Sequence, residues 1–220
     1  MKRIIALLTM AVFIFMLAGC AASNSSSQAE KSQASNSAAS KSETESSKAA
    51  DETKAENSYT ANGGKTLVVY FSATGTTKGV AEQIASFTGA DTYEITAAQP
   101  YTSDDLNYND SDSRTTKEQN DKSVRPEISS EKLDLAGYST IYIGYPIWWG
   151  EEPRIMDTFV ESYSFDGIAV IPFCTSSSSG IGRSGKNLAD NAGSGNWLEG
   201  QRFGAGASEA EISSWIDSLH

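Results

Sequence analysis

The stretch that decides the fold is Lys65-Thr-Leu-Val-Val-Tyr-Phe71, followed at once by Ser72-Ala-Thr-Gly-Thr-Thr77. The first seven residues form a continuous apolar run rich in β-branched and aromatic side chains, which predicts a strand covered on both faces. The next six form a loop of small and hydroxyl-bearing residues. Beyond the loop, residues 78–87 carry apolar side chains at helical spacing, and Gly89 is placed to end that helix.

Segments with strand and helix patterns continue to alternate as far as residue 220. The other expected strands are 91–95, 138–145, 167–173 and a weak one at 197–203. The other expected helices are 153–163, 184–191 and one that starts at Ser208 with the capping-box pattern Ser208-Glu-Ala-Glu211. This alternation predicts an α/β fold of three layers, in which helices cover both faces of a doubly wound, five-stranded parallel sheet.

The polar segment 96–126 interrupts this pattern. It is too long for an ordinary connection between a strand and the next element of a compact domain. We expect it to be partly helical near residues 113–119 and to end at Arg125-Pro126, because a residue before proline leaves the helical region.

The first 64 residues differ in composition from the rest. Lys2 and Arg3 precede an apolar run of 15 residues, which is short for a membrane span and typical of a signal peptide. The run ends in Leu17-Ala-Gly-Cys20, which resembles the lipobox of bacterial lipoproteins. The resemblance implies that residues 1–19 are a signal peptide and that Cys20 is acylated. The alternative is an ordinary cleaved signal peptide with an incidental cysteine.

Residues 20–64 are expected to form a disordered tether. From residue 21 on, this segment contains no Leu, Ile, Val, Phe or Trp, so it cannot bury enough apolar surface to offset the entropy of ordering. The folded domain is therefore expected at 65–220. With the lipid at Cys20, that domain is predicted to be extracytoplasmic and anchored at the cell membrane.

Two rare residue types exclude several kinds of active site. The only histidine is His220, which excludes histidine-based catalytic triads and histidine zinc sites. The only cysteines are Cys20 and Cys174, too few for thiolate zinc sites or iron–sulfur clusters. We therefore expect neither a metal site nor a catalytic group of side chains. Cys174 is expected to be a small buried side chain and not a redox thiol.

The net charge of −11 lies within residues 65–220, which contain 11 basic and 22 acidic side chains. Such a surface disfavours nucleic acid and anionic lipid as partners. It favours a partner protein with a basic docking surface.

Three loops follow strands at the edge where ligands bind in a doubly wound sheet. Residues 72–77 offer four hydroxyls and the N–H groups of a helix N-terminus, but no lysine, which suits a phosphomonoester better than a triphosphate with Mg²⁺. Residues 145–150 contain two adjacent tryptophans, and at least one is expected to face a ligand or partner. Residues 174–182 supply small hydrogen-bond donors for the edge of a flat ring. Taken singly, these loops have plainer explanations, namely an N-cap turn, a hydrophobic lid and a flexible linker.

Together, these loops resemble those of the flavodoxin family, whose sheet has the strand order 2-1-3-4-5 with FMN at the switch point. The resemblance covers residues 65 to about 219 and includes the T-G-x-T core of the first loop. Many flavodoxins carry an aromatic residue in the third loop, and this chain has none there. The implied FMN contacts are Ser72, Ala73, Thr74, Gly75, Thr76 and Thr77 for the phosphate, Pro146, Ile147, Trp148, Trp149 and Gly150 beside the ring, and Thr175, Ser176, Ser177, Ser178 and Gly180 at its pyrimidine edge.

The resemblance implies an FMN-binding electron-transfer protein anchored to the outer face of the cell membrane. One-electron transfer needs no side-chain acid or base, so the lack of a catalytic group agrees with a carrier. One alternative is an FMN-dependent NAD(P)H:quinone-type or nitro-type reductase, and another is a non-redox binding module on the same fold. A receiver domain fits worse because residues 144–146 offer no acidic side chain, and a low-molecular-weight phosphatase fits worse because Ser72 stands where a cysteine is needed.

Overall fold

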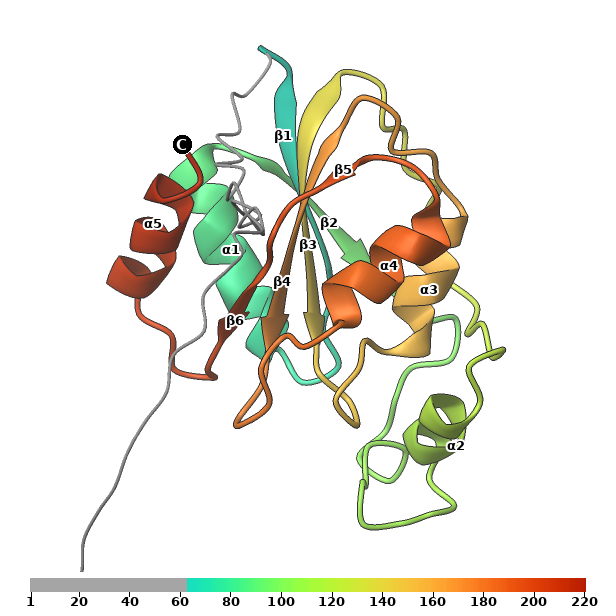
Figure 1. Ribbon diagram of the computed structural model, residues 1–220. Coiled ribbons are helices and arrows are strands. Elements are labelled where there is room, and N and C mark those ends of the chain that lie inside the picture. Colours follow the sequence, from blue (N-terminus) through green and yellow to red (C-terminus); the bar gives the residue numbers. More distant parts are fainter. Residues whose placement is uncertain (1–62) are drawn as a thin grey trace, which may run out of the picture. The chain divides into compact units, whose positions relative to one another are not determined.

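The computed structural model describes residues 63–220. The predicted signal peptide at 1–19, the lipidation site at Cys20 and nearly all of the predicted tether at 20–64 lie outside the described residues. Within the described part, strands and helices alternate along the chain as expected (Figure 1). None of the helices in this part is long and apolar enough to cross a membrane.

All strand pairs in the sheet are parallel, and the strand order is β2-β1-β3-β4-β5, with β6 also paired to β4. This order confirms the predicted doubly wound α/β fold with the order 2-1-3-4-5. The predicted fourth strand was placed two residues early: Gly167 has a positive φ of 75° and belongs to a turn, so the strand starts at Ala169. The strands are β1 (Lys65–Phe71), β2 (Asp91–Ile95), β3 (Tyr138–Pro146), β4 (Ala169–Thr175), β5 (Asn196–Trp197) and β6 (Gln201–Phe203).

The weak fifth strand predicted at 197–203 is split into β5 and β6. The main-chain oxygen of Val170 accepts a hydrogen bond from Leu198 N at 2.9 Å, so β4 faces the fifth strand at this residue. Two residues on, Pro172 faces the same neighbour but has no N–H to donate, and the ladder is interrupted there. It resumes where Phe173 pairs with Gln201.

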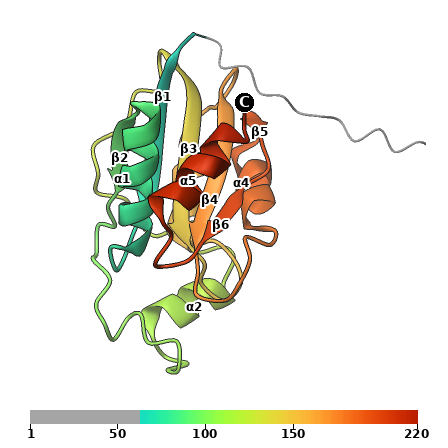
Figure 2. The same cartoon turned by 90° about the vertical axis from the view of Figure 1, so that its left-hand side faces the viewer.

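Helices cover both faces of the sheet (Figure 1), and Figure 2 looks onto one of these faces. On one face lie α1 (Thr76–Thr88) and α5 (Glu209–Asp217). On the other lie α3 (Arg154–Glu161) and α4 (Ser184–Ala192). The expected helix boundaries at Gly89 and Ser208 are present: Gly89 ends α1 in the left-handed conformation, and the Ser208 hydroxyl accepts from Glu211 N at 3.2 Å.

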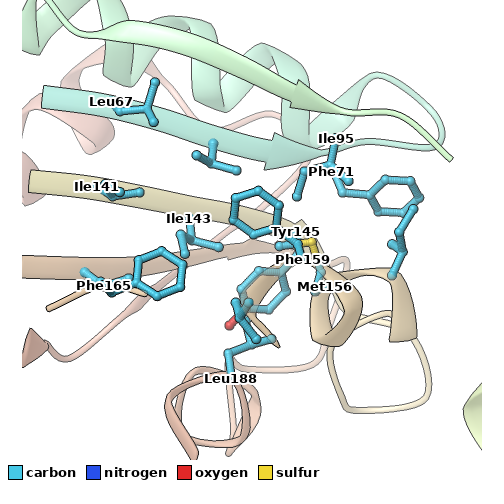
Figure 3. Packing of buried hydrophobic residues seen from close by; sticks show 14 of the residues in the cluster. Leu67, Phe71, Ile95, Ile141, Ile143, Tyr145, Met156, Phe159, Phe165 and Leu188 are labelled. Carbon is cyan, nitrogen blue, oxygen red and sulfur yellow. The ribbon is translucent and has the colours of Figure 1, made fainter. Parts of the chain in front are cut away.

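Alternate side chains of β1 enter two separate cores. Val68 and Tyr70 pack toward α1 and α5. Leu67 and Phe71 pack toward α3 and α4, together with residues of β3 such as Ile143 (Figure 3). Because both faces of β1, β3 and β4 are buried, their carboxyl ends are fixed, and the loops that leave them start from rigid positions.

The polar segment before β3 contains α2 (Arg114–Asn120), close to the predicted 113–119. The Ser113 hydroxyl caps this helix by accepting from Thr116 N at 3.3 Å. The segment lies at the carboxyl end of the sheet, next to the loops that carry the predicted site (Figure 1).

Candidate functional site

A cavity of about 720 Å³ opens at the carboxyl ends of β1, β3 and β4. Residues from all three predicted loops line it, and the polar segment before β3 adds to its wall. The lining residues that were predicted are Ala73, Thr74, Thr76, Thr77, Pro146, Ile147, Trp148, Trp149, Thr175, Ser176, Ser177 and Ser178. The predicted residues that do not line it are Ser72, Gly75, Gly150 and Gly180, and the lining residues not predicted are Leu106, Tyr108, Thr115, Ser179 and Ala205.

Ser72 and Gly75 shape the first loop from outside the cavity. The Ser72 hydroxyl accepts a hydrogen bond from Gly75 N at 3.1 Å, and Gly75 has a φ of 87°. The turn brings the chain into α1 at Thr76, where the first main-chain N–H groups have no acceptor within the helix. These N–H groups, with the hydroxyls of Thr74 and Thr76 in the cavity wall, form a neutral cradle for an anion.

The second loop is a tight turn with unusual backbone geometry. Trp148 and Glu151 exchange two main-chain hydrogen bonds, at 3.0 and 3.1 Å. Between them, Trp149 has a φ of 51° and Gly150 a φ of 82°, the signs of a type I′ turn. Trp149 is the sole non-glycine residue with positive φ in residues 63–220, and this conformation costs about 1–2 kcal/mol. Its side chain is 43% exposed and lines the cavity.

The neighbouring Trp148 is placed differently. Its ring packs edge-on against Phe71 and Tyr101, with centroid distances of 5.6 and 5.2 Å, and it is only partly exposed. Trp148 therefore joins the wall of the cavity to the core. Of the two tryptophans, Trp149 is the one with an exposed face for a ligand.

The second loop is held by α2. Gln119 is buried, and its side-chain amide donates to the main-chain oxygens of Trp148 at 2.9 Å and Glu152 at 3.1 Å. In turn, the guanidinium of Arg154 donates to the main-chain oxygen of Gln119 at 3.2 Å. The sequence contains no spacing signal that links Gln119 to Trp148, because their contact depends on how the polar segment packs.

Arg154 is buried and lies among three carboxylates. It pairs with Glu151 at 2.6 Å, Asp157 at 3.5 Å and Glu152 at 3.6 Å. Burial raises the pKa of Glu152 to about 7, although Asn187 donates a hydrogen bond to its carboxylate at 3.2 Å. Burial likewise raises the pKa of Asp157. This buried polar cluster underlies the turn of the second loop.

The third loop is fixed from two sides. The Ser176 hydroxyl accepts from the main-chain N–H groups of Ser178 and Ser179, at 3.3 and 2.9 Å. Arg202 in β6 donates to the main-chain oxygens of Ser176 and Ser177, at 2.6 and 2.9 Å. The loop thus turns tightly without the aromatic side chain that many flavodoxins have at this place.

The first and third loops are also joined to each other. The buried hydroxyls of Thr77 and Thr175 lie 2.8 Å apart and share a hydrogen bond. Next to Thr175, Cys174 is completely buried, and burial raises the pKa of its thiol to about 12. The thiol is therefore protonated at neutral pH, in agreement with the expected structural role of Cys174.

The cavity wall is electrically neutral. None of its 17 lining residues carries a charge, although the surrounding domain has a net charge of −11. No group of three or more His, Cys, Asp or Glu side chains within residues 63–220 is placed to hold a metal ion. The arrangement suits a ligand with one anionic group for the N–H cradle and a neutral flat part for the tryptophan.

Comparisons with known proteins agree with this geometry. A crystal structure of a protein from Bacteroides uniformis ATCC 8492 is 47% identical, covers 70% of this chain and 99% of its own, and gives a TM-score of 0.67. A crystal structure of a protein from Bacteroides eggerthii DSM 20697 is 45% identical, covers 71% of this chain and 98% of its own, and gives a TM-score of 0.66. A flavoprotein from Lactobacillus acidophilus NCFM, crystallised in complex with FMN, is 26% identical. It covers 70% of this chain and 99% of its own, and gives a TM-score of 0.52.

No curated protein matches this chain. A family model, described as Flavodoxin, matches residues 65–219, which include the strands and helices of the described part of the chain and all three loops around the cavity. The chain belongs to the flavodoxin family.

Proposed function

We propose that this protein binds FMN and transfers electrons at the outer face of the cell membrane. The observation that carries the proposal is that one cavity joins the N–H cradle at the start of α1 to the strained, exposed Trp149. A non-glycine residue is held in an unfavourable conformation where the surrounding structure determines it, and such residues gather at functional sites. The FMN complex of the Lactobacillus acidophilus relative supports the choice of ligand.

The residues present fit FMN in three respects. The phosphate matches the hydroxyls and N–H groups of the first loop, since a monoester needs no lysine there. The flat ring matches the exposed face of Trp149, and its polar edge matches the hydroxyl-bearing residues Ser177 and Ser178 in the cavity wall. A volume of about 720 Å³ is within the usual range for a cofactor-sized ligand.

Bound FMN supplies the redox chemistry, and the protein supplies binding, orientation and electrostatic field. The net charge of −11 disfavours additional negative charge, so we expect it to lower the reduction potential of the bound cofactor. The cavity wall offers no charged acid or base, which supports a carrier over a reductase that moves protons. The same negative charge supports a partner protein with a basic docking surface.

A titration of the full chain with FMN, in mild detergent, tests the cofactor. We expect flavin absorption bands in the protein fraction and quenched flavin emission, because the ring stacks on Trp149. Thr76→Val removes a cradle hydroxyl and is expected to weaken binding, whereas Thr92→Val, on the exposed part of β2, leaves it unchanged. Failure of the wild type to bind at tens of micromolar FMN contradicts the proposal.

Electron donors and acceptors separate the carrier from the reductase alternative. A carrier reduced chemically is expected to pass electrons to a basic acceptor such as cytochrome c, at a rate that falls steeply with salt. NADH and NADPH should leave the oxidised protein unchanged. Rapid bleaching of the flavin by either nucleotide supports the reductase alternative. If FMN does not bind at all, the non-redox binding module is favoured.

The membrane anchor rests on the sequence around Cys20. Metabolic labelling with palmitate, followed by detergent phase partitioning, is expected to place the labelled wild-type protein in the detergent phase. Cys20→Ser should abolish the label. Cys174→Ser should keep the label, because Cys20 is retained and the buried Cys174 is not the proposed site of acylation. Protease digestion of intact cells with the wall removed tests the outer face. A label that survives Cys20→Ser contradicts lipidation at this residue.

A further inference from the structure

Large apolar side chains are rarely exposed on this domain, and two of them gather at the cavity. Among residues 63–220, only Phe87, Tyr108 and Trp149 are exposed large hydrophobic residues. Tyr108 and Trp149 both line the cavity, and Phe87 does not. Tyr108 is 75% exposed, so burial in the core does not account for an aromatic side chain there.

The backbone around Tyr108 is held on both sides. The Asn107 side chain accepts from Asn109 N at 3.1 Å, and the Asn107 main-chain oxygen accepts from Asp110 N at 3.1 Å. The Asp110 main-chain oxygen in turn accepts from the hydroxyl of Thr116 in α2 at 2.9 Å. An exposed aromatic ring on a backbone fixed in this way is prepared for contact with something outside the chain.

The same helix also contacts the loop that carries the other exposed aromatic residue of the cavity, Trp149. Gln119 in α2 binds the main-chain oxygen of Trp148, next to Trp149. One helix therefore sets the position of the loops that carry both Tyr108 and Trp149. The third loop, residues 174–182, has no aromatic residue, so Tyr108 gives the cavity wall an aromatic side chain that this loop does not provide.

We propose that Tyr108 is the second aromatic contact of the site, and that Tyr108 and Trp149 together hold a flat, uncharged ring. The neutral lining of the cavity within an acidic domain supports a ring without charge. This inference rests on the proposed function and deepens it. The ring that Tyr108 contacts is that of FMN itself or, with FMN on Trp149, that of a small flat electron acceptor of the quinone class, since both present a neutral flat face.

The test compares Tyr108→Ala, Tyr108→Phe and Phe87→Ala in the full chain. FMN affinity is measured by flavin fluorescence. Tyr108→Ala is expected to weaken it about three- to tenfold through loss of stacking, while Tyr108→Phe keeps it within about twofold. Phe87→Ala, an exposed aromatic removed outside the cavity, should leave it unchanged. Thermal unfolding of the ligand-free variants should differ little, because Tyr108 is exposed.

A second arm distinguishes the source of the ring. Calorimetry measures binding of coenzyme Q0, a small uncharged benzoquinone, to each variant loaded with FMN. Weaker Q0 binding by Tyr108→Ala, with FMN affinity unchanged, assigns the ring to an acceptor. If the wild type binds FMN and Tyr108→Ala changes neither affinity, this inference is overturned and the proposed function stands. If the wild type does not bind FMN, both are wrong.

Discussion

The side-chain amide of Gln119 lies 2.9 Å from the main-chain oxygen of Trp148, across 29 positions of sequence. This contact ties α2 to the turn that displays Trp149. It makes the polar segment before β3 part of the candidate site.

Replacing Gln119 with Met is expected to loosen this turn. The change removes both of these hydrogen bonds, and although the Trp148 oxygen keeps the bond from Glu151 N, we expect a loss of about 1–3 kcal/mol in unfolding free energy. FMN affinity should fall as well. Urea denaturation and an FMN titration measure the two effects. Gln99→Met, at an exposed position, is the control and should change neither. If Gln119→Met changes stability and FMN affinity as little as Gln99→Met does, the contact between Gln119 and Trp148 does not hold the turn.

Replacing Trp149 with Gly is expected to stabilise the free protein and weaken cofactor binding. Glycine adopts a positive φ without strain, so unfolding free energy should rise by about 1 kcal/mol. The lost stacking should weaken FMN binding about tenfold. Trp148→Ala is the contrast, because that ring packs on Phe71 and Tyr101, and its loss should destabilise by about 3 kcal/mol. Unchanged FMN affinity in Trp149→Gly removes the main support for the proposed site.

Glu152 is expected to make stability depend on pH near neutrality. Its pKa is about 7 in the folded protein, compared with an ordinary value of 4.5. Between these two pH values the folded state therefore binds more protons than the unfolded state. Its contribution to stability is therefore present below pH 4.5 and lost as pH rises through 7. Asp157, whose pKa is also raised, acts in the same direction. Urea denaturation from about pH 5 to pH 8 should give a falling curve for the wild type and a flatter one for Glu152→Gln.

Glu151 provides the matched control for that experiment. Hydrogen bonds from Arg154 and Lys122 lower the pKa of Glu151, so its contribution is present above its ordinary pKa and lost on acidification. Glu151→Gln should therefore flatten the curve only at acidic pH. A Glu152→Gln curve that runs parallel to the wild type over the neutral range shows that Glu152 is not the group responsible.

Thr77 and Thr175 are expected to be energetically coupled. Each single change to Val leaves one buried hydroxyl without its partner, at about 1–3 kcal/mol, whereas the double variant removes both hydroxyls. The double variant should therefore cost less than the two single changes added together, by about 1 kcal/mol. Urea denaturation of the four ligand-free proteins measures this difference. Simple additivity indicates that the loops are held together by other contacts.

The positions of the main strands and helices could be predicted from the sequence alone. The apolar run at 65–71 and the short strand at 91–95 have the predicted bounds, because both depend on local pattern. The fifth strand was predicted without its break, because the break depends on Pro172 in the neighbouring strand. A property that depends on a residue in another element has no local signal.

The same distinction explains what was missed in the site. The three loops follow buried strands, so their meeting at one edge could be predicted from topology. Tyr108 and Leu106 could not be placed, because their segment reaches the cavity through contacts of Tyr101 and Gln119 with Trp148. The length of the segment was the available signal, since a long connection in a compact domain is often functional.

The direction of β1 has a consequence for how the domain meets a partner. The preceding chain joins the domain at Lys65, and the cavity begins beyond Phe71, at the other end of the strand. Seven extended residues separate these points by about 23 Å. The preceding chain is therefore attached to the domain on the side opposite the opening of the cavity. If that chain ends in a lipid at Cys20, as proposed, the point of attachment leaves the opening of the cavity uncovered, and a partner can reach it.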